Sequence, residues 1–270
     1  MKPECWRDKA VCSTPLECQL SRNCLGGLDP EEGNAHLVEI RALLKTPQYY
    51  NRALQELASQ CSTCKDCPHS ETAGQSVFDK GDPASSLVFI GEAPGETDDQ
   101  EGELYVGETG KLLDKMIARM KKEVGQDFPT PYITNVLKHW PPDGKLMKSG
   151  EDVRACTPKL YNQLNVLPNM RVIVTLGKVA THALLGVNMP IGKLRGRSFH
   201  NSRTGYKLVW TDDRCGEDLP DSSSEWRDPN RRIIVVPTWH PAYLNHQPNR
   251  MEPRHQCWSD LQIALRALRS

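Results

Sequence analysis

The chain has 270 residues, which allows one large domain, alone or with a small appendage. Its 34 basic residues balance its 34 acidic residues, which excludes a polycation of the histone kind, although a neutral protein can still carry a local basic patch. No stretch approaches the roughly 18 apolar residues that span a bilayer, and the first residues have no apolar core for a signal peptide. We therefore expect a cytoplasmic protein without a membrane partner.

Ten cysteines are many for that compartment. A reducing cytoplasm disfavours disulfides, so clustered cysteines there indicate metal or cluster ligands. Residues 1–33 hold few aliphatic side chains, and we expect an N-terminal extension without a core of its own, followed by one domain over residues 34–270. The extension contains Cys5, Cys12, Cys18 and Cys24. Their spacing is not that of a zinc ribbon; they form either a second metal site or a set of ordinary thiols.

The first elements after the extension are helical. Leucine and isoleucine recur at helical spacing over residues 37–57, and Pro47 divides this stretch into two pieces. A loop follows that carries Cys61, Cys64 and Cys67 at intervals of three residues.

From residue 87 onward, short apolar runs alternate with helical periodicity. The runs at 87–90, 132–137, 172–176 and 233–236 predict strands, and amphipathic segments between and after them predict helices. Continuous apolar strands alternating with helices indicate an α/β fold with a four-stranded parallel sheet covered on both faces. Residues 200–230 do not fit the alternation, and we expect an insertion there, either a hairpin or partly disordered.

Three polar residues follow predicted strands. Glu92 comes after the first strand, Asn135 lies near the end of the second, and His240 follows the fourth. In an open parallel sheet, ligands bind outside the carboxyl ends of the strands. The sequence therefore predicts a site where a carboxylate, a carboxamide and an imidazole converge.

These residues lie in four ordered motifs that resemble those of the uracil-DNA glycosylase superfamily. The closest pattern is its iron–sulfur branch, called family four, and the likeness runs over about 200 residues from Cys64 to the C-terminus. The motifs are Gly91-Glu92-Ala93-Pro94-Gly95, Tyr105-Val106-Gly107, Tyr132-Ile133-Thr134-Asn135-Val136 and His240-Pro241-Ala242-Tyr243-Leu244. The resemblance implies a three-layer α/β/α sandwich and a monofunctional glycosylase that hydrolyses the N-glycosidic bond of deoxyuridine in DNA.

The resemblance also implies roles for individual residues. Tyr105 takes the position of an aromatic that stacks on uracil, where phenylalanine is commoner, and Asn135 reads the uracil edge. His240 donates a hydrogen bond to uracil O2 as negative charge develops there. Glu92 is the first choice for the carboxylate that stabilises the sugar cation and orients water, and Asp98 is the second. Uracil contacts are thus expected from Glu92, Ala93, Tyr105, Asn135 and His240.

Contacts to the DNA backbone and bases are expected from two segments. The segment after His240 resembles the loop that enters the minor groove, where an apolar residue can unstack bases. It supplies Tyr243 or Leu244 as the wedge, and Arg250 and Arg254 as phosphate ligands. A second basic strip contains Lys193, Arg195 and Arg197.

The resemblance further implies a [4Fe-4S] cluster. Cys64 and Cys67 match its Cys-x2-Cys pair, and Cys156 matches its fourth ligand. At the third position, where the family usually has cysteine, this chain has His139. His139 is the favoured ligand because the framework sets its position; in the alternative, Cys61 supplies the third thiolate. A zinc site of three cysteines and one histidine is a further alternative.

The expected partner is uracil-containing DNA, single- or double-stranded, and the expected state is a monomer. Two other functions stay open. One is a uracil-DNA-binding protein on the same fold, either non-catalytic or covalently crosslinking; the other is a glycosylase for another damaged or modified base. Retention of Glu92, Asn135 and His240 together favours catalysis, and the absence of histidine from residues 141–151 disfavours crosslinking.

Overall fold

The computed structural model describes residues 46–204, 207–214 and 231–270. The N-terminal extension with Cys5, Cys12, Cys18 and Cys24 lies outside these ranges, as does most of the insertion. Two statements made from the sequence, the second metal site and the extent of the insertion, therefore stay predictions.

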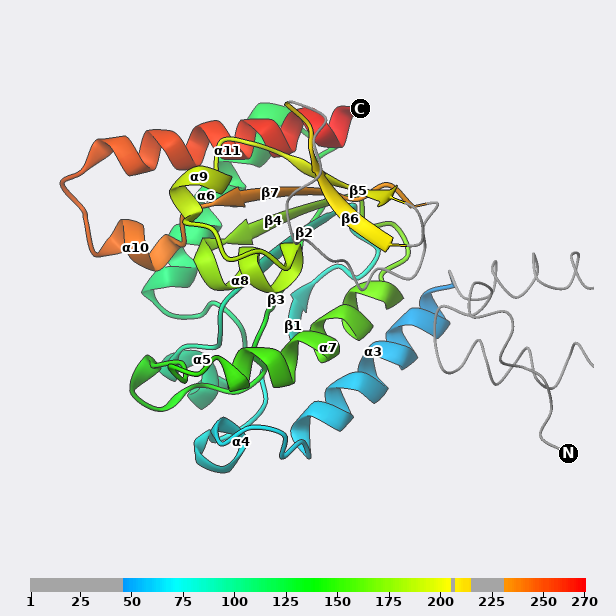
Figure 1. Ribbon diagram of the computed structural model, residues 1–270, viewed down its shortest axis with the longest axis vertical. Helices are drawn as coiled ribbons and strands as arrows, with labels where there is room; N and C mark the ends of the chain where they lie inside the picture. The colour runs from blue at the N-terminus through cyan, green and yellow to red at the C-terminus, as the bar shows by residue number, and fades with distance from the viewer. Residues whose placement is uncertain (1–45, 205–206, 215–230) are drawn as a thin grey trace, which may run out of the picture.

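A seven-stranded sheet in the order β1-β3-β2-β4-β7-β5-β6 forms the centre of the fold (Figure 1). Its four middle strands, β3, β2, β4 and β7, are mutually parallel. They confirm the predicted parallel core. Their bounds are Tyr132–Asn135 for β3, Leu87–Gly91 for β2, Val172–Leu176 for β4 and Ile234–Thr238 for β7.

Antiparallel strands extend this core on both edges. β1 (Asp79–Gly81) pairs with β3, and β5 (Phe199–Thr204) pairs with β7 and with β6 (Lys207–Asp212). The start of the predicted insertion is thus a hairpin that belongs to the main sheet. These three strands contain polar residues, so the search for continuous apolar runs did not mark them.

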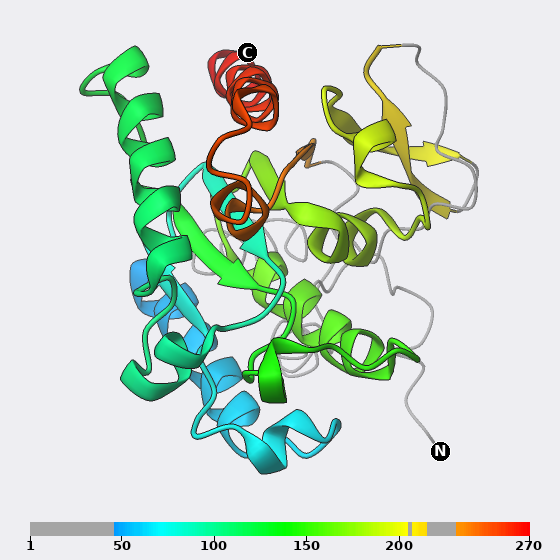
Figure 2. The same cartoon turned by 90° about the vertical axis from the view of Figure 1, so that its left-hand side faces the viewer.

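Helices cover both faces of the sheet, as Figures 1 and 2 show. α6 (Glu108–Val124) and α11 (Met251–Arg269) lie on one face, and α3 (Pro47–Ser62), α7 (Glu151–Val166) and α8 (Gly177–Leu185) lie on the other. The three-layer α/β/α fold is confirmed. The short helices are α4 (His69–Thr72), α5 (Glu96–Glu101), η1 (Pro142–Gly144), α9 (Ile191–Leu194) and α10 (Pro241–Asn245). None of the helices in the described ranges is long and apolar enough to cross a membrane.

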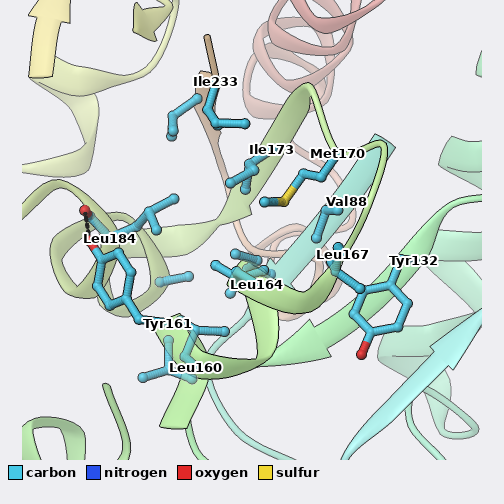
Figure 3. Close-up of a cluster of buried hydrophobic side chains, with 14 of the residues drawn as sticks. Val88, Tyr132, Leu160, Tyr161, Leu164, Leu167, Met170, Ile173, Leu184 and Ile233 are labelled. Carbon is cyan, nitrogen blue, oxygen red and sulfur yellow. Dashed lines mark hydrogen bonds between the residues drawn. The ribbon is translucent and has the colours of Figure 1, made fainter. Parts of the chain in front are cut away.

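Two apolar cores stabilise the layers because the middle strands are buried on both faces. Successive residues of a strand point to opposite sides. Val88 of β2 therefore packs under α7 and α8, whereas Phe89 packs under α6 and α11. Leu160 of α7 is fully buried in the first core, beside Tyr161, whose hydroxyl donates to the Leu184 carbonyl oxygen at 2.7 Å (Figure 3).

Leu160→Ala should lower the free energy of unfolding by about 2–5 kcal/mol, because a fully buried leucine is replaced by a cavity. Urea denaturation followed by circular dichroism measures this loss. Leu112→Ala, at a half-buried position of α6, is the matched control and should cost clearly less. Equal losses for the two variants would contradict the packing described.

Candidate active site

The carboxyl ends of the four parallel strands bring the predicted polar residues to one rim. Gly91 ends β2 and pairs in register with Asn135, which ends β3. Leu176 ends β4 and pairs with Thr238, which ends β7, two residues before His240. α10 lies beyond this end of the sheet in Figure 1. Parallel register thus brings together side chains more than 100 residues apart in sequence.

Asn135 has one satisfied and one unsatisfied amide atom. Its Oδ1 accepts a hydrogen bond from the Tyr105 hydroxyl at 3.1 Å. Its Nδ2 is buried and has no hydrogen-bond partner. Buried polar groups are almost always paired, so an orphaned donor at a strand end indicates a ligand with an acceptor atom there.

Tyr105 is held in a strained conformation. Its φ of 58° is the only positive φ of a non-glycine residue in the described ranges. Two glycines make room for it: a Cβ on Gly91 would lie 1.9 Å from the Tyr105 hydroxyl, and one on Gly110 would lie 1.7 Å from the Tyr105 carbonyl oxygen. Such strain persists only where the surroundings fix it, and it concentrates at functional sites.

Asp98 holds the loop that carries Tyr105. One carboxylate oxygen accepts from the Gly95 amide at 3.1 Å, and the other accepts from the Val106 amide at 3.0 Å. Asp99, the next residue, is 7% exposed and accepts from the amides of Gly74 and Gln75. Both aspartates are therefore engaged in shaping the loop.

Glu92 differs from them because no described residue holds its carboxylate by a hydrogen bond or an ion pair. Burial, and next the charge of Asp152, raise the pKa of Glu92 above its usual value. Asp152 is fully buried and accepts from His69 Nε2 and from the Met147 amide, each at 2.8 Å. Glu92 is thus the carboxylate left available to a ligand.

His240 is fixed as one neutral tautomer. Its Nδ1 accepts a hydrogen bond from the Ala242 amide at 3.1 Å, so the ring proton resides on Nε2. Burial lowers the pKa of His240 to about 4, which keeps the ring uncharged at neutral pH. A Cβ on Gly177 would lie 2.9 Å from the His240 Cβ, so the first residue of α8 must be glycine for the imidazole to sit there.

A buried ion pair holds the segment before His240. Asp260 of α11 is fully buried; it accepts from Thr238 Oγ1 at 2.8 Å and makes a bidentate pair with Arg195 at 2.8 and 3.0 Å. The side chain of Trp239 donates to Gln256 at 2.8 Å. Arg195, predicted to contact DNA, therefore has its charge paired inside the protein.

The other predicted DNA contacts differ in how far their side chains are exposed. Lys193 and Arg250 are exposed, and Tyr243 is half-buried with its ring stacked on Trp239 at 4.9 Å between centroids. Leu244 is 3% exposed and packs in the core. These positions leave Tyr243, and not Leu244, available as a wedge.

Arg197 and Arg254 of the predicted set are half-buried, as Arg195 is. Arg197 pairs with Asp212 at 2.7 Å, and Arg254 donates to the Leu244 carbonyl oxygen at 3.3 Å. Arg197 thus resembles Arg195 in having an internal partner. Met251, 57% exposed at the start of α11, is an apolar side chain on the same segment that sequence motifs did not mark.

Cys61 and Cys156 lie near Lys138, and Cys64 and Cys67 lie near those two cysteines. Cys61, Cys67 and Cys156 are buried and Cys64 is half-buried, and none of them forms a disulfide. Burial raises the pKa of Cys61 and of Cys156, and the neighbouring thiols Cys64 and Cys67 add to the rise for Cys61 and Cys156 respectively. The backbone amide of Asp66 donates to Cys64 Sγ at 3.5 Å, and that of Lys138 hydrogen-bonds Cys156. No three ligand side chains in the described ranges are grouped as a site for a single metal ion.

His139 follows Lys138 in the chain and is 5% exposed. Burial lowers the pKa of His139, whereas the charge of Asp99 raises it. Soft thiols, amide donors to sulfur and a neutral imidazole are the chemistry of an iron–sulfur site. The donor set therefore fits a cluster, whose ligands bind different irons and lie farther apart than the ligands of one ion.

Comparison with known proteins agrees with this rim of amide, carboxylate and imidazole on a three-layer sheet. A family model for the uracil DNA glycosylase superfamily matches residues 78–262. The chain is 32% identical over 201 residues to a type-4 uracil-DNA glycosylase of Sulfurisphaera tokodaii, an alignment that covers 73% of this chain and 78% of that relative. It is 29% identical over 198 residues to one of Thermotoga maritima, covering 73% and 85%. The chain belongs to the uracil DNA glycosylase superfamily, and its predicted resemblance to the type-4 branch is confirmed.

The pKa of Glu92 should lie above the ordinary 4.5, because burial and the charge of Asp152 both disfavour its carboxylate form. Asp152→Asn removes the neighbouring charge, so it should lower the pKa of Glu92 and extend the charged form to more acidic pH. Carbon-13 NMR of labelled glutamate follows the titration, and Glu92→Gln assigns the signal. A Glu92 pKa at or below 4.5, or a rise in Asp152→Asn, would contradict the assignment.

Proposed function

We propose that this protein is a monofunctional uracil-DNA glycosylase, which hydrolyses the N-glycosidic bond of deoxyuridine and leaves an abasic site. The observation that carries the proposal is the orphaned Nδ2 of Asn135 at the rim where Glu92 and His240 also lie. Superfamily membership and the type-4 relatives support the same activity.

In this proposal, Asn135 selects uracil over cytosine. Nδ2 donates to uracil O4, and Oδ1 accepts from N3–H while its second lone pair receives the Tyr105 hydroxyl. Cytosine offers a donor at position 4 and an acceptor at N3, so both hydrogen bonds would be lost. Leaving Nδ2 unpaired in a buried site costs about 1–3 kcal/mol.

His240 and Glu92 act at the two ends of the bond that breaks. The bonding electrons pass to uracil, and neutral Nε2–H of His240 donates to O2 as negative charge grows there. The deoxyribose becomes cationic; the carboxylate of Glu92 stabilises it and accepts a proton from the water that adds to it. We propose Asp98 as a positioning residue, since its oxygens hold the loop of Tyr105.

A base inside a duplex must be flipped out before it can reach this rim. We propose Tyr243 as the side chain that unstacks the bases, with Lys193, Arg250 and Arg254 on the phosphates. Arg195 and Arg197 support this surface from within, because their charges are paired with Asp260 and Asp212. Single- and double-stranded DNA are both accepted substrates in this proposal, and the acting species is a monomer.

We also propose a [4Fe-4S] cluster held by Cys64, Cys67, Cys156 and His139. When bound, it would crosslink the loop after α3, the segment after β3 and the start of α7, and excision itself needs no electron transfer. Cys61 is the alternative to His139 as ligand. Cys61 and Cys156 both lie near enough to Lys138 to influence the pKa of its ammonium group.

The test of function is incubation with uracil-containing oligonucleotides, single- and double-stranded, followed by alkali. Strand scission after alkali, with release of free uracil, supports the glycosylase. A shifted band that survives denaturation would indicate a covalent adduct, and binding without scission would indicate a non-catalytic protein; either overturns the proposal. Scission with another damaged base and not with uracil would overturn the assigned specificity.

His240→Ala should lower the single-turnover rate of uracil excision about 100- to 1,000-fold, because it removes a donor to the developing anion. Binding of uracil-DNA should change much less. His246→Ala is the matched control, because His246 is exposed on the same segment. A rate for His240→Ala close to that of His246→Ala would remove His240 from the mechanism.

The cluster ligands can be separated by metal analysis of anaerobically purified protein. With His139 as ligand, His139→Ala should labilise the cluster, His139→Cys should retain it, and Cys61→Ser should do little. With Cys61 as ligand, the effects of His139→Ala and Cys61→Ser are exchanged. If the wild-type protein is colourless and contains stoichiometric zinc, the site binds zinc and not an iron–sulfur cluster.

A further inference from the structure

The hydroxyl of Tyr105 makes a contact that a phenylalanine at the same position would lack. It donates to Asn135 Oδ1 at 3.1 Å, and both side chains are buried. Among the described residues, Asn135 Oδ1 is the only acceptor for the hydroxyl proton. Burial, and next the charges of Asp98 and Glu92, raise the pKa of Tyr105. The phenol therefore keeps its proton and acts as the donor.

The backbone fixes the place where the hydroxyl meets the amide. Tyr105 has a φ of 58°, and the amide of Val106 next to it is held by Asp98 at 3.0 Å. Gly91 leaves open the space between the two side chains. A Cβ on Gly91 would lie 1.9 Å from the Tyr105 hydroxyl and 2.3 Å from Asn135 Oδ1. Parallel register with Gly91 fixes Asn135 in turn, so the hydroxyl is held against one atom of the amide.

The amide of Asn135 has two orientations, which differ by half a turn that exchanges Oδ1 and Nδ2. In the observed orientation the phenol proton and Oδ1 satisfy each other, and only Nδ2 has no partner. In the other orientation Nδ2 would donate to the hydroxyl oxygen, but the phenol proton and Oδ1 would both be unpaired. Unpaired buried polar groups are costly, so the hydroxyl favours the observed orientation.

We infer that Tyr105 is a specificity-determining residue, whose hydroxyl fixes the Asn135 amide in the orientation that binds uracil and rejects cytosine. The inference rests on the proposed function, in which Nδ2 donates to uracil O4 and Oδ1 accepts from N3–H. The turned amide would present an acceptor to the 4-amino group of cytosine and a donor to its N3. Asn135 by itself is thus compatible with either base, and the Tyr105 hydroxyl excludes cytosine.

Tyr105→Phe in the full chain tests this role, because it removes the hydroxyl and keeps the ring. The probes are single-stranded oligonucleotides that differ only in one 2′-fluorinated deoxyuridine or deoxycytidine. The fluorine disfavours the sugar cation, so the base stays attached and binding is measured without excision. The ratio of the two Kd values should fall about tenfold or more, mainly through tighter binding of the cytosine probe. Circular dichroism verifies that the variant is folded.

Two further variants separate this role from a merely structural one. Tyr161→Phe is the matched control, because it also removes a buried phenol hydroxyl. The Leu184 carbonyl oxygen that this hydroxyl bonds also accepts from Trp210 Nε1 at 3.0 Å, so it stays paired and the base preference should not change. In an Asn135→Ala background, Tyr105→Phe should have no further effect on the ratio, because no amide is left to orient.

Three results would overturn the inference. They are an unchanged ratio in Tyr105→Phe, even if both probes bind more weakly, an equal change in Tyr161→Phe, and an effect of Tyr105→Phe that persists in the Asn135→Ala background. Uracil excision by the wild type is measured separately with unmodified oligonucleotides. A protein that prefers the uracil probe but releases no uracil would overturn the proposed glycosylase alone. Excision of uracil with an unchanged ratio in Tyr105→Phe would overturn this inference alone.

Discussion

Parallel register of β3, β2, β4 and β7 is the constraint on which the site depends. It aligns the ends of strands that are far apart in sequence, so that Asn135 pairs with Gly91 and Thr238 pairs with Leu176. Each strand can end abruptly at the rim because the next residues turn away into loops or helices. Shifting one strand by a residue would turn its side chains to the opposite face and separate the amide from the imidazole.

Close approach at the rim depends on glycine. Gly91 and Gly110 admit Tyr105, and Gly177 admits His240, in each case at distances where a Cβ would collide. Around these contacts, buried polar groups fix the functional side chains: Asp98 fixes the Tyr105 loop, and Asp260 with Arg195 fixes the start of the His240 segment. Each of the three candidate groups at the rim keeps a hydrogen-bonding atom without a protein partner. These atoms are Nδ2 of Asn135, Nε2–H of His240 and the carboxylate oxygens of Glu92.

Sequence patterns predicted the parts of the fold with strong local signals. The four parallel strands and their covering helices came from apolar runs and helical periodicity, and the rim came from the topological rule for parallel sheets. The β5–β6 hairpin was left as one of two alternatives, because its strands, FHNSRT and KLVWTD, contain polar residues and form no continuous apolar run. Among the predicted DNA contacts, Arg195 and Leu244 turned inward, because Asp260 and the apolar core offered each a better partner than solvent.

The sequence by itself determined the fold class, the superfamily and the identity of the groups at the rim, because these depend on periodicity and on ordered motifs. Only the tertiary structure decided which polar groups are free and which are already paired. Lys138 reads as an ordinary charged residue after a strand, yet it is fully buried between Asn135 and Cys156. No local pattern marks such a residue, because its burial is created by α3 and α7, which pack on the sheet from elsewhere in the chain.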